Sequence, residues 1–202
     1  MKILAVELSS AHGSLAWSDS GAVVEREWPN DRKNSGPFFE NLAEVRRKFG
    51  LPDKIIVGLG PGSYAGTRIA ISAAIGLQAA SGGGLIGYPS VCAFESDQRE
   101  YCVIGDARRD SFFFARIRAN NLVAGPDLFA EAELRKELDK LEANMLVFAS
   151  EKLPQFERAE LGYPSAVVLA RLASDVNRKF VQPPIQPMYL REPHITRPRI
   201  FV

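Results

Sequence analysis

The order of hydrophobic patterns in the first 88 residues constrains the fold of this chain more than any other feature. Three short, β-rich apolar segments come first and are joined by tight turns, which predicts an antiparallel meander. A helix, a buried strand, a long helix and a short strand follow, and strands connected through helices favour parallel pairing. The order β-β-β-α-β-α-β therefore predicts a mixed sheet flanked by helices. The predicted strands are residues 2–8, 14–18, 22–28, 54–59 and 85–88.

Two helices are expected between these strands. Asn34 or Ser35 can cap the first, Pro37 is tolerated in its first turn, and Gly50 ends it. The second spans about residues 64–80 and is rich in small residues, so that it packs closely on several sides. It is either a buried core helix or one that also packs against a partner subunit. The apolar stripe of the first helix comprises Phe38, Leu42, Val45 and Phe49, widened by Phe39 and Ala43.

The second half of the chain has weaker patterns. Strands are expected at residues 101–105, 111–118 and 145–149, and helices at residues 130–141 and 165–180. From Gln182 the chain is rich in proline and is expected to lie extended across the surface. We therefore divide the chain into an N-terminal lobe, residues 1–98, and a reduced C-terminal lobe with an extended proline-rich tail, residues 99–202. The tail prolines are Pro183, Pro184, Pro187, Pro193 and Pro198.

Composition excludes several classes of protein. The chain has 25 basic and 24 acidic residues, a net charge of +1, which gives no electrostatic footprint for autonomous nucleic-acid binding. Cys92 and Cys102 form no CxxC pair and are expected to be reduced, partly buried side chains. No signal peptide and no membrane-spanning stretch is recognisable, so we expect a soluble, cytoplasmic protein.

The most informative segment is residues 58–76, GLGPGSYAGTRIAISAAIG. Gly60, Gly62 and Gly66 allow the backbone to approach other groups closely, and Ser63 can cap the helix that follows. Backbone amides at a helix start can cradle an anion. The spacing, however, is neither GxGxxG nor the P-loop, and the P-loop lysine is missing. A structural turn and a phosphate-binding loop both remain open.

Two acidic segments are further candidates for a nucleotide or metal site. Glu7 and Ser9 stand at the end of the first strand, where a carboxylate and a hydroxyl can hold Mg²⁺-bound phosphate or can simply close a polar turn. Asp106 opens the charged segment 106–110 and can bind a metal or cap a surface turn whose charges neutralise one another.

No catalytic or metal centre is recognisable in the sequence. His12 and His194 lie far apart, and neither HxxxH nor HExxH is present to hold a metal on one helix face. The GxSxG nucleophile elbow is absent too. These patterns favour a binding protein over an enzyme and predict no metal ligands.

Several segments together resemble one known family. GPGSYAGTRIAISAAIGL is similar to the glycine-rich signature of the TsaB (YeaZ) family, and KILAVELSS is similar to the start of that family's chains. IGYPSV, the Asp106-Ala107-Arg108 turn and PMYLR at residues 187–191 resemble further family motifs. The resemblance covers the N-terminal lobe well and the C-terminal lobe thinly.

The resemblance implies an actin-like ATPase (ASKHA, ribonuclease H-like) α/β fold with a shortened second lobe. It implies a non-catalytic scaffold that pairs with TsaD, its catalytic paralogue, and joins the ATPase TsaE in threonylcarbamoyl transfer to an adenosine of tRNA. The tRNA would then be contacted only indirectly. No cofactor is expected on the chain alone, with ATP and Mg²⁺ entering at the level of the complex.

The resemblance also implies where the partner binds, since the first two helices form the partner face in this family and can support a homodimer of the isolated protein. The implied interface residues are Phe38, Phe39, Leu42, Val45, Arg46, Gly66, Arg68 and Ile69. The implied nucleotide or anion loop comprises Glu7, Ser9, Gly60, Gly62 and Ser63.

The chain departs from the family pattern at Glu7 and Leu8, where an aspartate and a threonine are usual, and at Asn34, where many relatives have histidine. These departures weaken the case for nucleotide binding by this chain alone. Two alternatives therefore stay open: an independent ATPase, kinase-like or peptidase-like enzyme of the actin fold, and a homodimeric interaction protein with another client.

Overall fold

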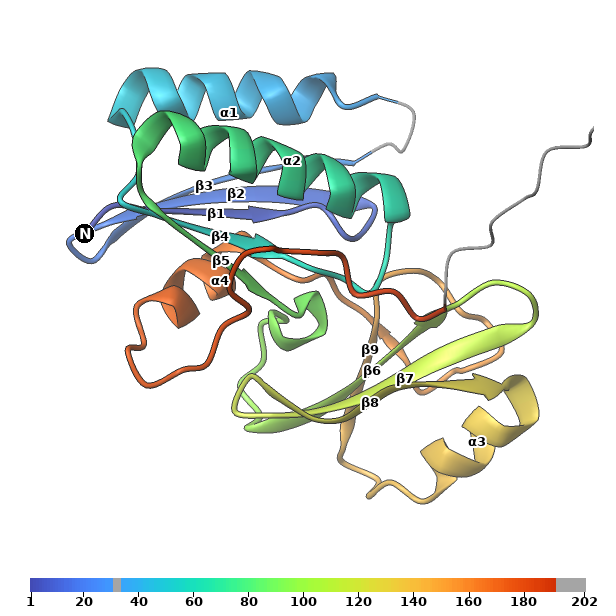
Figure 1. Cartoon of the computed structure of the whole chain (residues 1–202). Helices are drawn as coiled ribbons and strands as arrows, with labels where there is room; N and C mark the ends of the chain where they lie inside the picture. The colour runs from blue at the N-terminus through green and yellow to red at the C-terminus, as the bar shows by residue number, and fades with distance from the viewer. Residues whose placement is uncertain (31–33, 192–202) are drawn as a thin grey trace, which may run out of the picture.

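The structure is a computed structural model that describes residues 1–30 and 34–191. Its first sheet has five strands in the order β3-β2-β1-β4-β5 (Figure 1). β1 (Ile3–Glu7), β2 (His12–Asp19) and β3 (Ala22–Pro29) form the predicted antiparallel meander. β4 (Lys54–Gly58) pairs parallel with β1, and β5 (Gly84–Tyr88) pairs parallel with β4. The predicted mixed sheet is confirmed.

Both helices that connect these parallel strands lie on one face of the first sheet (Figure 1). α1 (Gly36–Phe49) begins where the Asn34 side chain accepts a hydrogen bond from the Gly36 amide, 2.9 Å away. α2 (Tyr64–Ser81) is capped by Ser63 as predicted and ends at Gly82, whose φ of 67° is left-handed. In the described ranges no helix is both long and apolar enough to cross a membrane.

The first sheet is buried on both faces. Along β1, Leu4 and Val6 pack toward α1 and α2, whereas Ile3 and Ala5 pack toward the other face, because successive strand residues point to opposite sides. That other face is covered by α4 (Ala166–Ala173), which contacts β1, β2 and β4. α4 thus comes from the predicted C-terminal lobe but packs on the first sheet. The predicted division of the chain at residue 98 stays a prediction.

A second five-stranded sheet has the order β10-β9-β6-β7-β8. β6, β7 and β8 form an antiparallel meander, and β9 joins the other edge of β6 in parallel. The 3-10 turn η1 (Ser90–Cys92) precedes β6, and α3 (Glu131–Asp139) connects β8 to β9. The strands are β6 (Glu100–Asp106), β7 (Ser111–Arg118), β8 (Asn121–Ala130), β9 (Leu146–Ala149) and β10 (Glu160–Leu161).

Two predictions for the second half need correction. The helix expected at residues 165–180 ends at Ala173, because the Asp175 side chain accepts a hydrogen bond from the Asn177 amide and turns the chain away. β8 is not predicted from the sequence because Gly125 and Pro126, residues typical of turns, stand in its middle. The structure accommodates them as an irregularity in the β7–β8 ladder.

The tail is extended as far as residue 191, but it does more than cross the surface. Val181 forms an isolated bridge with Gly87 of β5, and Ile185 is buried in the core beneath α2. The Met188 amide donates to the Leu59 carbonyl at 2.8 Å. The tail therefore closes the core, whereas Pro193 and Pro198 lie outside the described residues.

Replacing Leu169 with alanine tests whether α4 is part of the core of the first sheet. Leu169 is fully buried, so we expect Leu169→Ala to lower the free energy of unfolding by about 2–5 kcal/mol in urea denaturation. Val167→Ala, at a half-buried position of the same helix, is the matched control and should cost clearly less. Equal losses in the two variants would contradict this packing.

Candidate functional site

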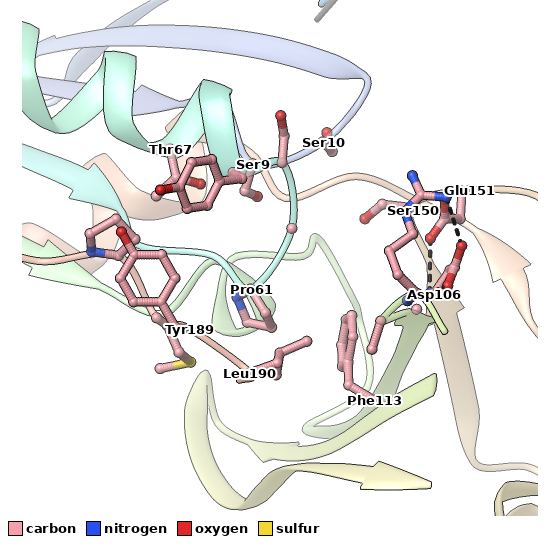
Figure 2. A pocket seen from close by; sticks show the side chains of 18 of the residues that line it. Ser9, Ser10, Pro61, Thr67, Asp106, Phe113, Ser150, Glu151, Tyr189 and Leu190 are labelled. Carbon is pink, nitrogen blue, oxygen red and sulfur yellow. Dashed lines mark hydrogen bonds and ion pairs between the residues drawn. The ribbon is translucent and has the colours of Figure 1, made fainter. Parts of the chain in front are cut away.

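A cleft of about 480 Å³ lies between the two sheets (Figure 2). One wall comes from the turn after β1, with Ser9 and Ser10, and from the glycine-rich loop that leads into α2. The opposite wall comes from the β6–β7 turn, with Asp106, and from Glu151 after β9. Tail residues 187–191 complete the lining. The cleft combines polar walls with apolar side chains.

The glycines of the loop are explained by close backbone contact. A Cβ atom on Gly62 would lie 2.1 Å from the Ser9 carbonyl oxygen, and one on Gly66 would lie 2.1 Å from the Leu8 carbonyl oxygen. Neither position tolerates a side chain, because in each case the Cβ atom would clash with a backbone carbonyl oxygen that cannot move aside. The loop and the first turn of α2 are thus pressed against the end of β1, which favours the structural interpretation of this motif.

Three amides of the loop and of the first turn of α2 donate to acceptors within the protein. The Ser63 amide donates to the Ser9 carbonyl at 2.6 Å, and the Gly66 amide donates to the Ser63 hydroxyl at 3.2 Å. The Gly60 amide donates to the Ser90 hydroxyl at 2.9 Å. Of the predicted anion loop, Ser9, Gly62 and Ser63 line the cleft, whereas Gly60 and Glu7 do not. An anion would have to compete with these internal hydrogen bonds.

Glu7 is fully enclosed at the end of β1. Its Oε1 accepts a hydrogen bond from the Ser9 amide at 2.6 Å. A Cβ atom on Gly58 would lie 1.8 Å from Oε2, so the longer side chain fits because residue 58 is glycine. Burial raises the pKa of the Glu7 carboxyl, and the Ser9 and Ser90 hydroxyls offset only part of this effect. Glu7 is thus a core acid and not a ligand presented to the cleft.

The other acidic candidate, Asp106, is held by its own turn. Its carboxylate accepts hydrogen bonds from the Arg108 amide at 2.6 Å and from the Arg108 guanidinium at 2.9 Å. Its amide donates to Glu151 Oε1 at 2.9 Å. The turn therefore neutralises its own charge, as in the interpretation of this segment as a surface turn. Within residues 1–30 and 34–191, no group of three His, Cys, Asp or Glu side chains is placed to hold a metal ion.

Of the two histidines, His12 lies in the described residues and contributes nothing to the cleft. His12 does not line it; its ring stacks on Tyr163, with centroids 5.0 Å apart, and Nδ1 lies 3.7 Å from Glu27. His194 lies outside the described residues.

The predicted partner face on α1 needs correction at three positions. Phe38 is 1% exposed, and Leu42 and Val45 are buried with it against the sheet. They belong to the core because α1 turns this stripe toward Trp28, whose ring lies 6.3 Å from that of Phe38. Phe39, one residue on, points outward and is 50% exposed. The two neighbouring phenylalanines thus have different roles, since Phe38 packs in the core and Phe39 is exposed beside it.

On α2, the predicted Gly66 is buried, Ile69 is half-buried and Arg68 is exposed, as is Arg46 on α1. Sequence analysis missed Ile75, which is 49% exposed on the outer side of α2. Its neighbours on that side are small or polar: Ala65, Ser72, Gly76 and Ala79. The helical period gives no clear signal for Ile75, because it lies seven residues from the exposed Arg68 but only four residues from the buried Ile71.

A contact between α2 and the tail was also missed. The rings of Tyr64 and Tyr189 lie 5.8 Å apart at the rim of the cleft, and the Arg68 guanidinium lies 4.9 Å from the Tyr64 ring. Since Tyr64 and Tyr189 are distant in the sequence, no local pattern signals their contact.

The buried acid generates a pH prediction. A raised pKa in the folded state means that Glu7 stabilises the fold fully below its unfolded pKa of 4.5 and that this contribution is lost as pH rises through the folded pKa. We expect the free energy of unfolding of Glu7→Gln, relative to the parent, to rise above pH 4.5 by up to about 1.4 kcal/mol per pH unit. Urea denaturation of both proteins up to neutral pH measures this difference.

Glu40→Gln, at an exposed position of α1, is the control and should follow the parent at every pH. If Glu7→Gln also follows the parent, the Glu7 carboxyl is ionised in the folded state, and its burial does not raise its pKa.

Two solved structures share this arrangement over nearly the whole chain. A protein with similarity to peptidase YeaZ from Pseudomonas aeruginosa is 18% identical, with a TM-score of 0.75 over 94% of this chain and 99% of that chain. YeaZ from Pseudomonas aeruginosa is 17% identical, with a TM-score of 0.74 and the same coverage. The sequence matches no protein-family model and no curated protein. Together with the strand order of the first sheet, these likenesses show that the chain has the same fold as these two YeaZ-like structures.

Proposed function

We propose that this chain is a non-catalytic scaffold that pairs with a TsaD-like catalytic subunit, and through it with a TsaE-like ATPase, in threonylcarbamoyl transfer to an adenosine of tRNA. The fold shared with YeaZ and the motif at residues 58–76 support the choice of partners. The balanced charge of the chain supports contact with tRNA through the partner and not directly.

The outer side of α1 and α2 carries this proposal. Phe39 and Ile75 stay about half exposed on helices whose other sides are already packed on the sheet. The small residues beside Ile75 would let a partner helix come close, and isolated aromatic and aliphatic side chains of this kind anchor interfaces. Without the partner, the same surface is proposed to pair with a second copy of the chain.

The cleft supports the non-catalytic part of the proposal. The amides of Gly60, Ser63 and Gly66 donate within the protein, Glu7 is enclosed, and the Asp106 carboxylate is paired with Arg108. We therefore propose that the chain binds no nucleotide by itself and that ATP and Mg²⁺ belong to the complex. An independent kinase-like or peptidase-like enzyme would need a group in this cleft that is free to react or to bind metal.

Substitution of Phe39 tests the interface. We expect Phe39→Asp to weaken the complex with the cognate TsaD-like subunit by at least about tenfold, because a charge replaces a central apolar anchor. The measurement is the dissociation constant by calorimetry, with size exclusion to show the complex. Val123→Asp is the matched control: Val123 is also 50% exposed, but it lies on β8 of the second sheet.

Circular dichroism shows whether a variant that does not bind is still folded. A folded Phe39→Asp variant that binds as well as the control would remove Phe39 from the interface. Absence of a complex between the parent chain and the TsaD-like subunit, with and without Mg²⁺-ATP, would reject the scaffold. Turnover of Mg²⁺-ATP by the purified parent would favour the enzyme instead.

A further inference from the structure

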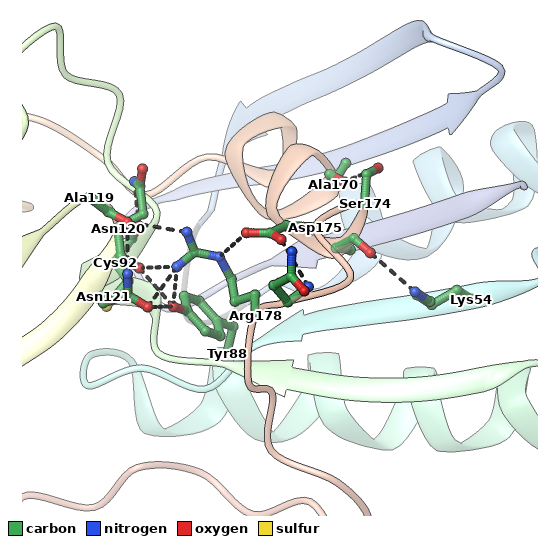
Figure 3. Close-up of polar contacts among 12 residues, drawn as sticks. Lys54, Tyr88, Cys92, Ala119, Asn120, Asn121, Ala170, Ser174, Asp175 and Arg178 are labelled. Atoms are coloured by element: carbon green, nitrogen blue, oxygen red, sulfur yellow. Dashed lines mark hydrogen bonds and ion pairs between the residues drawn. The ribbon is translucent and has the colours of Figure 1, made fainter.

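The Arg178 guanidinium, which does not line the cleft, joins segments of both sheets (Figure 3). The Arg178 side chain is only 10% exposed. It donates to the Tyr88 hydroxyl at 2.7 Å, at the end of β5 in the first sheet. It also donates to Asn120 and Asn121 oxygens, both at 2.9 Å, and to the Ala119 carbonyl at 3.2 Å, in the β7–β8 turn of the second sheet.

Further contacts surround this group. The Tyr88 hydroxyl donates to the Asn120 carbonyl at 2.7 Å, and the Asn120 side chain donates to the Cys92 carbonyl of η1 at 2.8 Å. Asp175 lies 3.6 Å from the Arg178 side chain. Charge-assisted hydrogen bonds that are shielded from water are stronger than ordinary ones. The cluster is therefore a tight junction between the end of β5 and the β7–β8 turn.

The opposite end of β7 is held by the same C-terminal segment. The Arg191 guanidinium donates to the hydroxyl of Ser111, the first residue of β7, at 2.7 Å. Between Arg178 and Arg191, the segment is bound to the first sheet: Val181 bridges to Gly87, and the Met188 amide donates to the Leu59 carbonyl. Residues 174–191, which we call the strap, thus fasten both ends of β7 to the first sheet.

The core beneath the strap is also shared by the two sheets. A single cluster of buried side chains joins Ile56 and Ile86 of the first sheet, Val103 and Ile117 of the second, and Leu169 of α4. Two sheets joined only by crossover segments can rotate as rigid bodies about a hinge. A shared core and a strap that holds both ends of one strand oppose such rotation.

We propose that the strap is a lock that makes the two sheets one rigid body, with Arg178 as its main anchor. The cleft then keeps one width, and it does not open and close by hinge rotation. Arginine is required at this position because its planar fork reaches oxygens of three successive turn residues together with the Tyr88 hydroxyl, which the single ammonium of lysine cannot do. This inference does not depend on the proposed partner.

Pulsed electron–electron double resonance, which measures the distance between two spin labels, tests the lock on the full chain. Spin labels are placed at Arg47→Cys on α1 and Lys136→Cys on α3, both exposed positions. Burial raises the pKa of Cys92 to about 12 and that of Cys102 to about 11, so neither native thiol competes for the label. We expect one narrow distance distribution in the parent and at least about a twofold increase in its width in Arg178→Ala.

Three further variants make the result decisive. Arg171→Ala, an exposed arginine of α4, should leave the distribution unchanged, and Arg178→Lys should give an intermediate width. If Arg178→Ala does not fold, Tyr88→Phe, which removes only one partner hydroxyl, takes its place and should also broaden the distribution. A broad distribution in the parent overturns the lock, as does a parent-like width in a folded Arg178→Ala or, in its place, Tyr88→Phe.

Discussion

The contact between the glycine-rich loop and the end of β1 is the constraint on which the rest of the structure depends. The Ser9 carbonyl lies where a side chain on residue 62 would be, and the Leu8 carbonyl lies where one on residue 66 would be. This approach fixes the first turn of α2 on the sheet and so decides which side of the helix is buried. The surface that α2 offers to solvent, with Ile75 on it, is a consequence of these two glycines.

Burial on both faces of the first sheet explains why part of the second half of the chain, α4, packs on it. A strand such as β1, apolar at every position from Ile3 to Val6, needs cover on both sides. α1 and α2 supply one side, and α4, which comes after the whole second sheet, supplies the other. The strap continues from α4, so that the helix that completes the first sheet also delivers Arg178 to the second.

The fold was largely predictable because the strands and helices of the first sheet have strong hydrophobic periods and clear turns. The parts that failed depend on contacts between distant residues or on residues with two roles. Gly125 and Pro126 resemble a turn but lie within β8, and Asp175 ends a helix whose apolar pattern continues beyond it. Of the candidate anion loop, Ser9, Gly62 and Ser63 line the cleft, and their binding of an anion stays a prediction. The apolar stripe of α1 grouped Phe38 with Leu42 and Val45, which are buried together, but it did not show that the adjoining Phe39 stays exposed.

Glu7 connects the chemistry of the cleft with the surface of the helices. An aspartate at the end of β1 would be one methylene shorter, whereas the glutamate reaches back into the space that Gly58 leaves and is lost to the cleft. The hydroxyl of the neighbouring Ser90 accepts a hydrogen bond from the Gly60 amide and so holds the loop inward as well. The contacts that keep the Glu7 carboxyl and the Gly60 amide out of the cleft also hold the loop, and through it α2, against the sheet. These internal contacts hold the surface of α1 and α2 in place, and a substitution that freed Glu7 or the loop would also loosen the proposed partner face.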